Sequence, residues 1–216
     1  QQVYANWQSV HQLWEQIYPT YKATVEKHNL AGIQFVMRWR LDIYVQVATF
    51  TCRFLAYSQD YQRLRDTSGA AIHYVGEWIE FWASTYRNGF RFNPNLLRYH
   101  YVTLVTWKAY ADLMLETRAG HKPDIRKLLE GINALQRTAQ NFRHTQHPLF
   151  LYVRAKYYQL TALHREAIND FVALLHVIEP FDSRSFNPFD FTLTLVREDL
   201  KEERKELIRE DVRTQL

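Results

Sequence analysis

The chain has 216 residues, of which 47% are hydrophobic, and it contains only six glycines and six prolines. This composition excludes a disordered chain and a β-protein with many tight turns, and the length is enough for a sizeable all-α core. The net charge of +4, from 27 basic and 23 acidic residues, gives no strong signature for nucleic acid or membrane binding. The single cysteine, Cys52, excludes an intramolecular disulfide and indicates a reducing compartment.

Apolar side chains recur at helical spacing at the start of the chain. A stripe at steps of three and four predicts a helix over residues 3–18 that ends at Pro19. The members of the stripe are Val3, Trp7, Val10, Trp14, Ile17 and Tyr18. Further helices are predicted over about 21–29 and about 33–61.

The predicted helix over 33–61 is unusually apolar. It has too few polar groups for a broad solvated face, so we expect it to be the buried central helix. Asp42, Gln46 and Arg53 interrupt its most apolar part, and no run of about 18 apolar residues remains to predict a transmembrane span. Cys52 lies on this helix and is expected to be a core thiol.

Turn-forming residues mark the next boundary. Residues 66–69 (Asp-Thr-Ser-Gly) are typical of a turn with an N-cap, and they predict a helix over 69–87 that Asn88 and Gly89 end. The apolar face of this predicted helix carries Ile72, Val75, Trp78, Ile79 and Trp82.

A further helix is predicted over 95–118. Gly120 is expected to end it, because glycine adopts the left-handed conformation that closes many helices. Pro123 is expected to start the following helix, over about 123–141, since proline suits the first helical turn.

Residues 147–181 predict two short helices folded back on each other, with a turn at residues 161–164. Small residues let the two helices approach closely, and aromatic rings fill the adjacent space. The residues expected to define this packing are Ala155, Tyr158, Ala167, Phe171 and Pro180, the last of which is predicted to end the second helix.

The C-terminal segment predicts a charged helix over about 193–213. Its thin apolar stripe contains Leu195, Leu200, Leu207 and Ile208. Such a helix is either a terminal cap on the fold or an arm that docks on a partner. The fold class predicted for the chain is all-α, with stacked antiparallel helical hairpins in a single domain over 1–192 and this charged helix over 193–216.

No catalytic constellation emerges from the sequence. His144 and His147 are three residues apart, but no carboxylate or cysteine cluster completes a metal site with them. Glu77, Glu80 and Glu116 lie on predicted helices, but the chain contains no E-x-x-H motif of the kind that di-iron bundles require. We therefore expect no enzyme activity, metal, cofactor or small-molecule substrate.

Basic and aromatic residues adjoin one another in two places, as in surfaces that stack RNA bases and bind phosphates. The two sets are Arg87, Arg91, Phe92, Arg98 and Tyr99, and Arg154, Lys156 and Tyr157. RNA binding is the alternative function. The mild net charge, and acidic residues interleaved with the basic ones, favour instead arginines on a solvated face and aromatics in a core.

The segment 147–181 resembles a tetratricopeptide-type hairpin. Ala155, Tyr158, Ala167 and Phe171 match that family's pattern in register. Three positions depart from the pattern: Leu174 replaces a small residue, Ala162 stands where glycine is usual, and Pro180 comes one position late. Residues 120–124 (Gly-His-Lys-Pro-Asp) resemble the G-x-x-P-D link between pentatricopeptide repeats.

This resemblance implies a helical-repeat subunit or adaptor that binds protein subunits of a larger assembly. In length and plan the chain is similar to the small pentatricopeptide-like accessory subunits on the F1 sector of euglenozoan mitochondrial ATP synthases. The resemblance implies a mitochondrial location and removal of a targeting peptide before Gln1. The residues expected to contact the partner are Phe90, Arg91, Phe92, Leu200 and Leu207.

Overall fold

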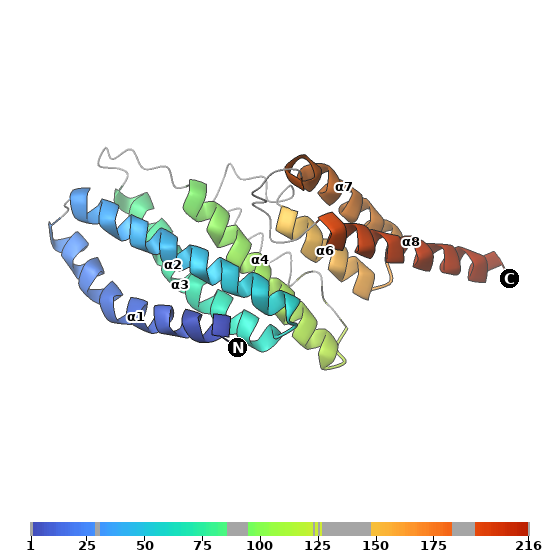
Figure 1. The fold of residues 1–216 in the computed structure, drawn as a ribbon, viewed down its shortest axis with the longest axis horizontal. Helices are drawn as coiled ribbons and strands as arrows, with labels where there is room; N and C mark the ends of the chain where they lie inside the picture. Colours follow the sequence, from blue (N-terminus) through green and yellow to red (C-terminus); the bar gives the residue numbers. More distant parts are fainter. Residues whose placement is uncertain are drawn as a thin grey trace. The chain divides into compact units, whose positions relative to one another are not determined.

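The computed structural model describes residues 2–28, 31–85, 95–122, 124, 126, 148–182 and 193–215. Its described part is all-α, as predicted, and contains seven helices and no strand. Their arrangement is drawn in Figure 1. None of these helices combines the length and the apolarity that crossing a lipid bilayer requires.

The chain divides into two compact units, Gln1–Ala111 and Asp112–Leu216. The division differs from the predicted single domain over 1–192. It also places the charged C-terminal helix inside the second unit, where that helix packs against its neighbour.

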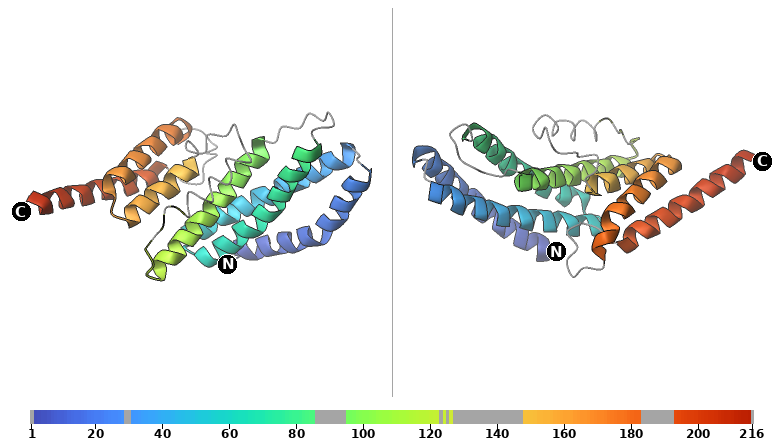
Figure 2. Two further views of the ribbon diagram at one scale, coloured as in Figure 1. Left: turned by 180° about the vertical axis from the view of Figure 1, so that it is seen from behind. Right: turned by 90° about the horizontal axis from the view of Figure 1, so that it is seen from above.

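The first unit contains α1 (Gln2–His28), α2 (Ala31–Tyr57), α3 (Tyr61–Thr85) and most of α4 (Asn95–Arg118). Helix α2 packs against both α1 and α3, and the three lie side by side in Figures 1 and 2. The bounds of α4 are those predicted from the sequence.

An aromatic cluster forms the core between α1, α2 and α3. Neighbouring ring centroids lie 4.8–6.4 Å apart, in stacked, tilted and edge-to-face arrangements that aromatic pairs favour. The members are Trp7, His11, Trp14, Tyr18, Tyr44, Tyr74 and Trp78. The predicted stripe on the first helix is confirmed, since Trp7, Trp14 and Tyr18 are its buried residues.

Pro19 does not end the first helix, which continues to His28. A proline inside a helix removes one backbone hydrogen bond and bends the axis. The bend of α1 is visible in Figures 1 and 2. Contacts on both sides of the proline hold the helix to its neighbours: Tyr18 donates a hydrogen bond to Glu77 of α3, and Lys22 lies 3.5 Å from the same carboxylate.

The predicted turn at residues 66–69 is wrong, because these residues lie inside α3. Ser68 is buried, and its hydroxyl donates to the carbonyl of Leu64 one turn earlier, which satisfies it within the helix. The chain reverses instead at residues 58–60. There Gln59 adopts a positive φ of 57°, and the Asp60 carboxylate accepts the backbone N–H of Arg63 as an N-cap.

Gly120 ends α4 as predicted. Its φ is +79°, and the N–H of His121 bonds to the carbonyl of Glu116 at 3.0 Å. The N–H of Gly120 itself bonds to the carbonyl of Thr117, which completes the paired bonds of a Schellman motif. The helix predicted from Pro123 lies almost entirely outside the described residues.

The second unit contains α6 (Pro148–Leu160), α7 (His164–Asp182) and α8 (Leu193–Gln215), and α7 packs against both other helices. The predicted hairpin of α6 and α7 is confirmed, with its turn at residues 161–163. Pro180 does not end α7, which continues to Asp182. The helix is close to its end there, so proline removes only a bond of the last turn.

The hairpin packs as its spacing predicts, with one difference. Ala155, Ala167 and Phe171 are fully buried, whereas Tyr158 is only half-buried. The ring that faces Phe171 belongs to Tyr152, with centroids 6.5 Å apart. The buried residues of α6 include Tyr152 and Tyr157 but not Tyr158.

Candidate protein interface

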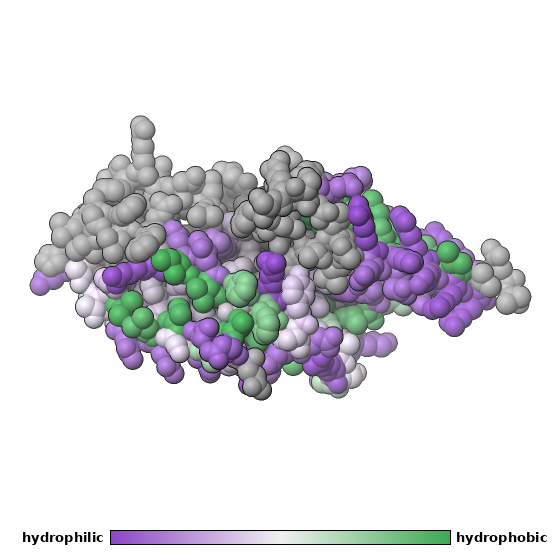
Figure 3. Space-filling view, viewed as in Figure 1, coloured by the Kyte–Doolittle hydropathy of each residue, from purple (hydrophilic) through white to green (hydrophobic). Residues whose placement is uncertain are grey.

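Helix α2 carries an exposed apolar surface, which we call the α2 outer face. Its members are Ile43, Phe50, Phe54 and Tyr57, which are 42%, 59%, 39% and 48% exposed. Their spacings of seven, four and three residues place them on one side of the helix. In Figure 3 apolar side chains gather over α2.

The opposite side of α2 packs against the neighbouring helices of the first unit. Leu41, Val45, Ala48, Cys52 and Leu55 are all buried there. The predicted buried central helix is therefore only half correct: α2 has one buried apolar face and one exposed apolar face. The sequence signal for the second face was the scarcity of polar residues, since a helix that is apolar all round needs contacts on every side.

The predicted partner contacts fall in two groups. Phe90, Arg91 and Phe92 lie outside the described residues. On α8, Leu200 is buried at 6% exposure within the second unit, and Leu207 is half-buried. Most of the Leu200 side chain is thus already in contact with this chain.

The predicted RNA-contacting set on α6 is occupied by contacts inside the second unit. Arg154 forms two bonds with the Asp170 carboxylate, and Lys156 lies 2.6 Å from Asp199 on α8. Tyr157 is buried. Cations held by carboxylates are poorly available to phosphates, so this set gives little support to RNA binding. Of the other set, only the Tyr99 side chain is described, half-buried.

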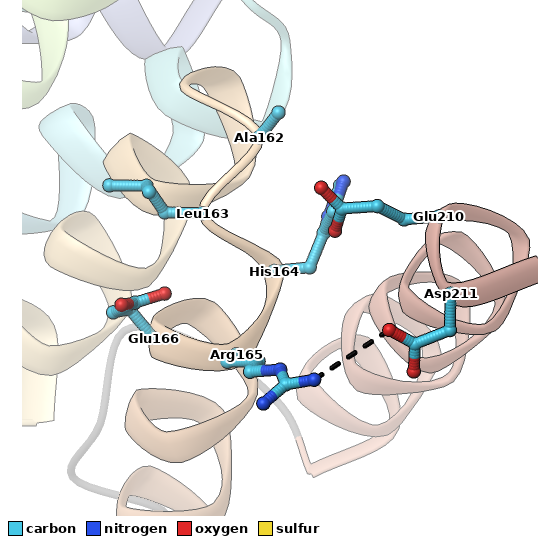
Figure 4. Close-up of a pocket in the computed structure, with 7 residues that line it drawn as sticks. All are labelled: Ala162, Leu163, His164, Arg165, Glu166, Glu210 and Asp211. Carbon is cyan, nitrogen blue, oxygen red and sulfur yellow. Dashed lines mark ion pairs between the residues drawn. The ribbon is translucent and has the colours of Figure 1, made fainter. Parts of the chain in front are cut away.

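A pocket of about 320 Å³ lies between the start of α7 and the end of α8. Figure 4 shows the seven lining residues, Ala162, Leu163, His164, Arg165, Glu166, Glu210 and Asp211. Arg165 and Asp211 pair across it at 3.6 Å, and both side chains are more than half exposed. Exposed pairs of this kind are weak, so the pocket is a solvated hollow with three acidic residues in its lining, and we assign no ligand to it.

A second groove of about 580 Å³ is lined by residues of α7 and α8, and we call it the basic groove. Leu175 of α7 lines one side, and the other lining residues come from α8. They are Arg197, Leu200, Lys201, Arg204, Lys205 and Ile208. Leu200, predicted to contact a partner, thus lines this groove together with four cations.

Burial and local contacts shift the pKa values of several described side chains in the first unit. The Tyr18 hydroxyl, Lys22 and His73 hold the pKa of Glu77 below its usual range, although partial burial opposes them. Burial raises the pKa of Tyr44, whose hydroxyl lies 2.9 Å from Nδ1 of His11. Burial also lowers the pKa of His100.

Among the residues that the structure describes, no three His, Cys, Asp or Glu side chains lie together in a way that could hold a metal ion. His144 and His147 lie outside the described residues. Cys52 is fully buried, as predicted.

Comparison with protein families, curated proteins and solved structures gives no match to the chain. The class that the structure defines is an all-α protein of packed helices with an exposed apolar helix face and a basic groove.

Proposed function

We propose that this protein is a non-catalytic subunit or adaptor that acts through protein–protein contacts. The α2 outer face carries this proposal. Three of its four residues are aromatic, and all four are at least 39% exposed. Aromatic side chains are enriched at protein interfaces, where few of them supply most of the binding energy.

The face is also costly to leave in water. Full burial of each half-exposed ring removes on the order of 100 Å² of further surface from solvent. At about 25 cal/mol per Å² this is about 2.5 kcal/mol of driving force per ring before the entropic cost of association is subtracted. A partner with a complementary apolar helix would bury this face.

The resemblance of the α6–α7 hairpin to tetratricopeptide repeats suggests the wider setting. Hairpins of this kind commonly present surfaces for protein binding. We propose a place in a larger, mitochondrial assembly, such as the F1 sector of an ATP synthase. The register of Ala155, Ala167 and Phe171 supports this proposal through the resemblance.

The test is affinity purification of the tagged, full-length protein from its native cells, followed by mass spectrometry and RNA sequencing. We expect to recover a stoichiometric protein complex with the wild type and to lose it with the variant Phe50→Ser/Phe54→Ser. The matched control is Leu13→Ser on α1, which removes another exposed apolar side chain, 56% exposed.

Recovery of the complex with both variants would assign binding to another surface and reject the α2 outer face. Enriched RNA without a stoichiometric protein partner would reject the adaptor role in favour of RNA binding. Recovery of the F1 subunits would identify the assembly, and a different complex would exclude the ATP synthase proposal.

A further inference from the structure

The basic groove is lined by four cationic side chains and has an apolar floor. Arg197, Lys201, Arg204 and Lys205 follow one another at steps of four, three and one on α8, so they share one side of the helix. The floor consists of Leu175, Leu200 and Ile208. The charged and apolar lining residues come from neighbouring turns.

Two of the four cations already have partners on the rim. Arg197 lies 3.4 Å from Glu179, and both side chains are more than half exposed. Lys205 lies 2.7 Å from Glu202. Lys201 and Arg204, at the centre of the row, are exposed and make no ion pair with any residue that the structure describes. They are the charges most available to a partner.

The apolar floor is incompletely covered. Leu200 is buried, but Ile208 is 63% exposed. Leu175 is half-buried on the facing helix. A ligand that covers this floor must offer apolar side chains, while the row of cations favours carboxylates beside them.

We propose that the basic groove binds an acidic amphipathic helix of a partner protein. Apolar side chains of that helix, at steps of three and four, contact mainly Leu175 and Ile208, beside the buried Leu200, and its flanking Asp or Glu residues pair with Lys201 and Arg204. This inference deepens the proposed protein-binding function and rests on it.

The lining of the groove favours a peptide over nucleic acid. Its floor is aliphatic, whereas single-stranded nucleic acid is typically bound by aromatic rings on which bases stack. The carboxylates of Glu179 and Glu202 lie on the rim and repel a phosphate backbone. An amphipathic helix can place its carboxylates away from them, because its charges occupy chosen positions.

The probe is a fluorescent synthetic peptide of about five helical turns, with leucine at steps of three and four and glutamate at the other positions. We would measure its binding to the full-length protein by fluorescence anisotropy, at about 50 mM and about 300 mM salt. We expect saturable binding that weakens at the higher salt concentration. A peptide of the same composition in scrambled order should bind at least about tenfold more weakly, because it lacks an apolar face.

Variants locate the binding. Lys201→Glu/Arg204→Glu should weaken peptide binding at least about tenfold, because two attractive contacts become repulsive. Arg209→Glu/Arg213→Glu is the matched control, since it makes the same charge change at exposed positions of α8 outside the groove. Ile208→Ser should weaken binding and leave the salt dependence unchanged. Circular dichroism of each variant checks that the helices remain formed.

Absence of peptide binding, or equal loss in the groove variant and its control, overturns the inference. The inference is also overturned if a 12-nucleotide oligouridine binds more tightly than the peptide and if Lys201→Glu/Arg204→Glu abolishes that RNA binding. This outcome would assign the groove to nucleic acid. The affinity purification separates the two proposals. A stoichiometric complex retained by the groove variant rejects the groove and keeps the adaptor function, whereas absence of any complex with the wild type rejects the adaptor function itself.

Discussion

Arg154 of α6 and Asp170 of α7 form a bidentate salt bridge across the helical hairpin. Nε and Nη2 of the guanidinium lie 2.6 and 2.7 Å from the two carboxylate oxygens. The Asp170 side chain is only 9% exposed, and the guanidinium also lies over the ring of Phe150. Two parallel bonds between planar groups fix the register of one helix against the other.

Loss of this pair should destabilise the hairpin. We expect Asp170→Asn to lower the free energy of unfolding by about 2–3 kcal/mol, because it leaves Arg154 partly buried without its counter-charge. Urea denaturation measures the change. Glu179→Gln, which breaks an exposed pair with Arg197, should cost less than about 1 kcal/mol.

The double variant Arg154→Met/Asp170→Leu tests whether the loss comes from an isolated charge. Two apolar side chains leave no buried charge without a partner, so this variant should be more stable than Asp170→Asn. If the double variant were the less stable of the two, the bridge would contribute net stability beyond compensating its own desolvation.

Ala162 has an unfavourable backbone conformation in the turn between α6 and α7. Its φ of 56° is unfavourable for a side chain with a Cβ atom, and the related repeat family usually has glycine at this position. We expect Ala162→Gly to raise the free energy of unfolding by about 0.5–1 kcal/mol, measured by thermal or urea denaturation.

Gly120 provides the reciprocal test. Its φ is +79°, and a Cβ atom built there would meet no atom within 4 Å, so only the backbone conformation opposes a larger residue. Gly120→Ala should therefore destabilise the protein by about 1 kcal/mol. Opposite signs for the two substitutions support the turn geometry, and equal signs contradict it.

Trp14 and Leu13 are adjacent in sequence but lie in different environments. Trp14 is 3% exposed in the aromatic core, whereas Leu13 is 56% exposed. Trp14→Ala should cost about 3–5 kcal/mol, because it leaves a large cavity, and Leu13→Ala should change stability by less than about 0.5 kcal/mol. Comparable losses from both would contradict the orientation of α1.

We expect the burial of His100 to make the protein less stable at acidic pH. Burial lowers its pKa in the folded protein below the ordinary value of 6.5, and its Nδ1 is buried without a hydrogen-bond partner among the described atoms. As the pH falls from about 7 to about 5, the unfolded chain gains a proton at this histidine that the folded chain resists. The free energy of unfolding should therefore fall over this range.

The measurement compares denaturation curves at several pH values. His100→Gln should show a smaller loss of stability on acidification than the wild type. His73→Gln is the control, since this histidine is 63% exposed. Identical pH dependence of the wild type and His100→Gln would exclude His100 as a source of the effect.

The sequence determined those features that depend on local periodicity and on residues with special backbone preferences. Trp7, Trp14 and Tyr18 repeat at the spacing of one helix face, and that face is buried. Gly120 ends α4 because glycine accepts a positive φ at little cost. The hairpin of α6 and α7 follows from small and aromatic residues at matching intervals.

Tertiary packing decided the helix boundaries and buried faces for which the local sequence signals were ambiguous. Ser68 looks like part of a helix cap in the sequence, but its hydroxyl is satisfied inside α3, and Pro19 is held inside α1 by contacts on both of its sides. Periodicity likewise marked α2 as apolar but could not say which face is buried. Only the three-dimensional arrangement shows that Cys52 is covered and Phe50 exposed, because burial depends on which helices lie beside α2.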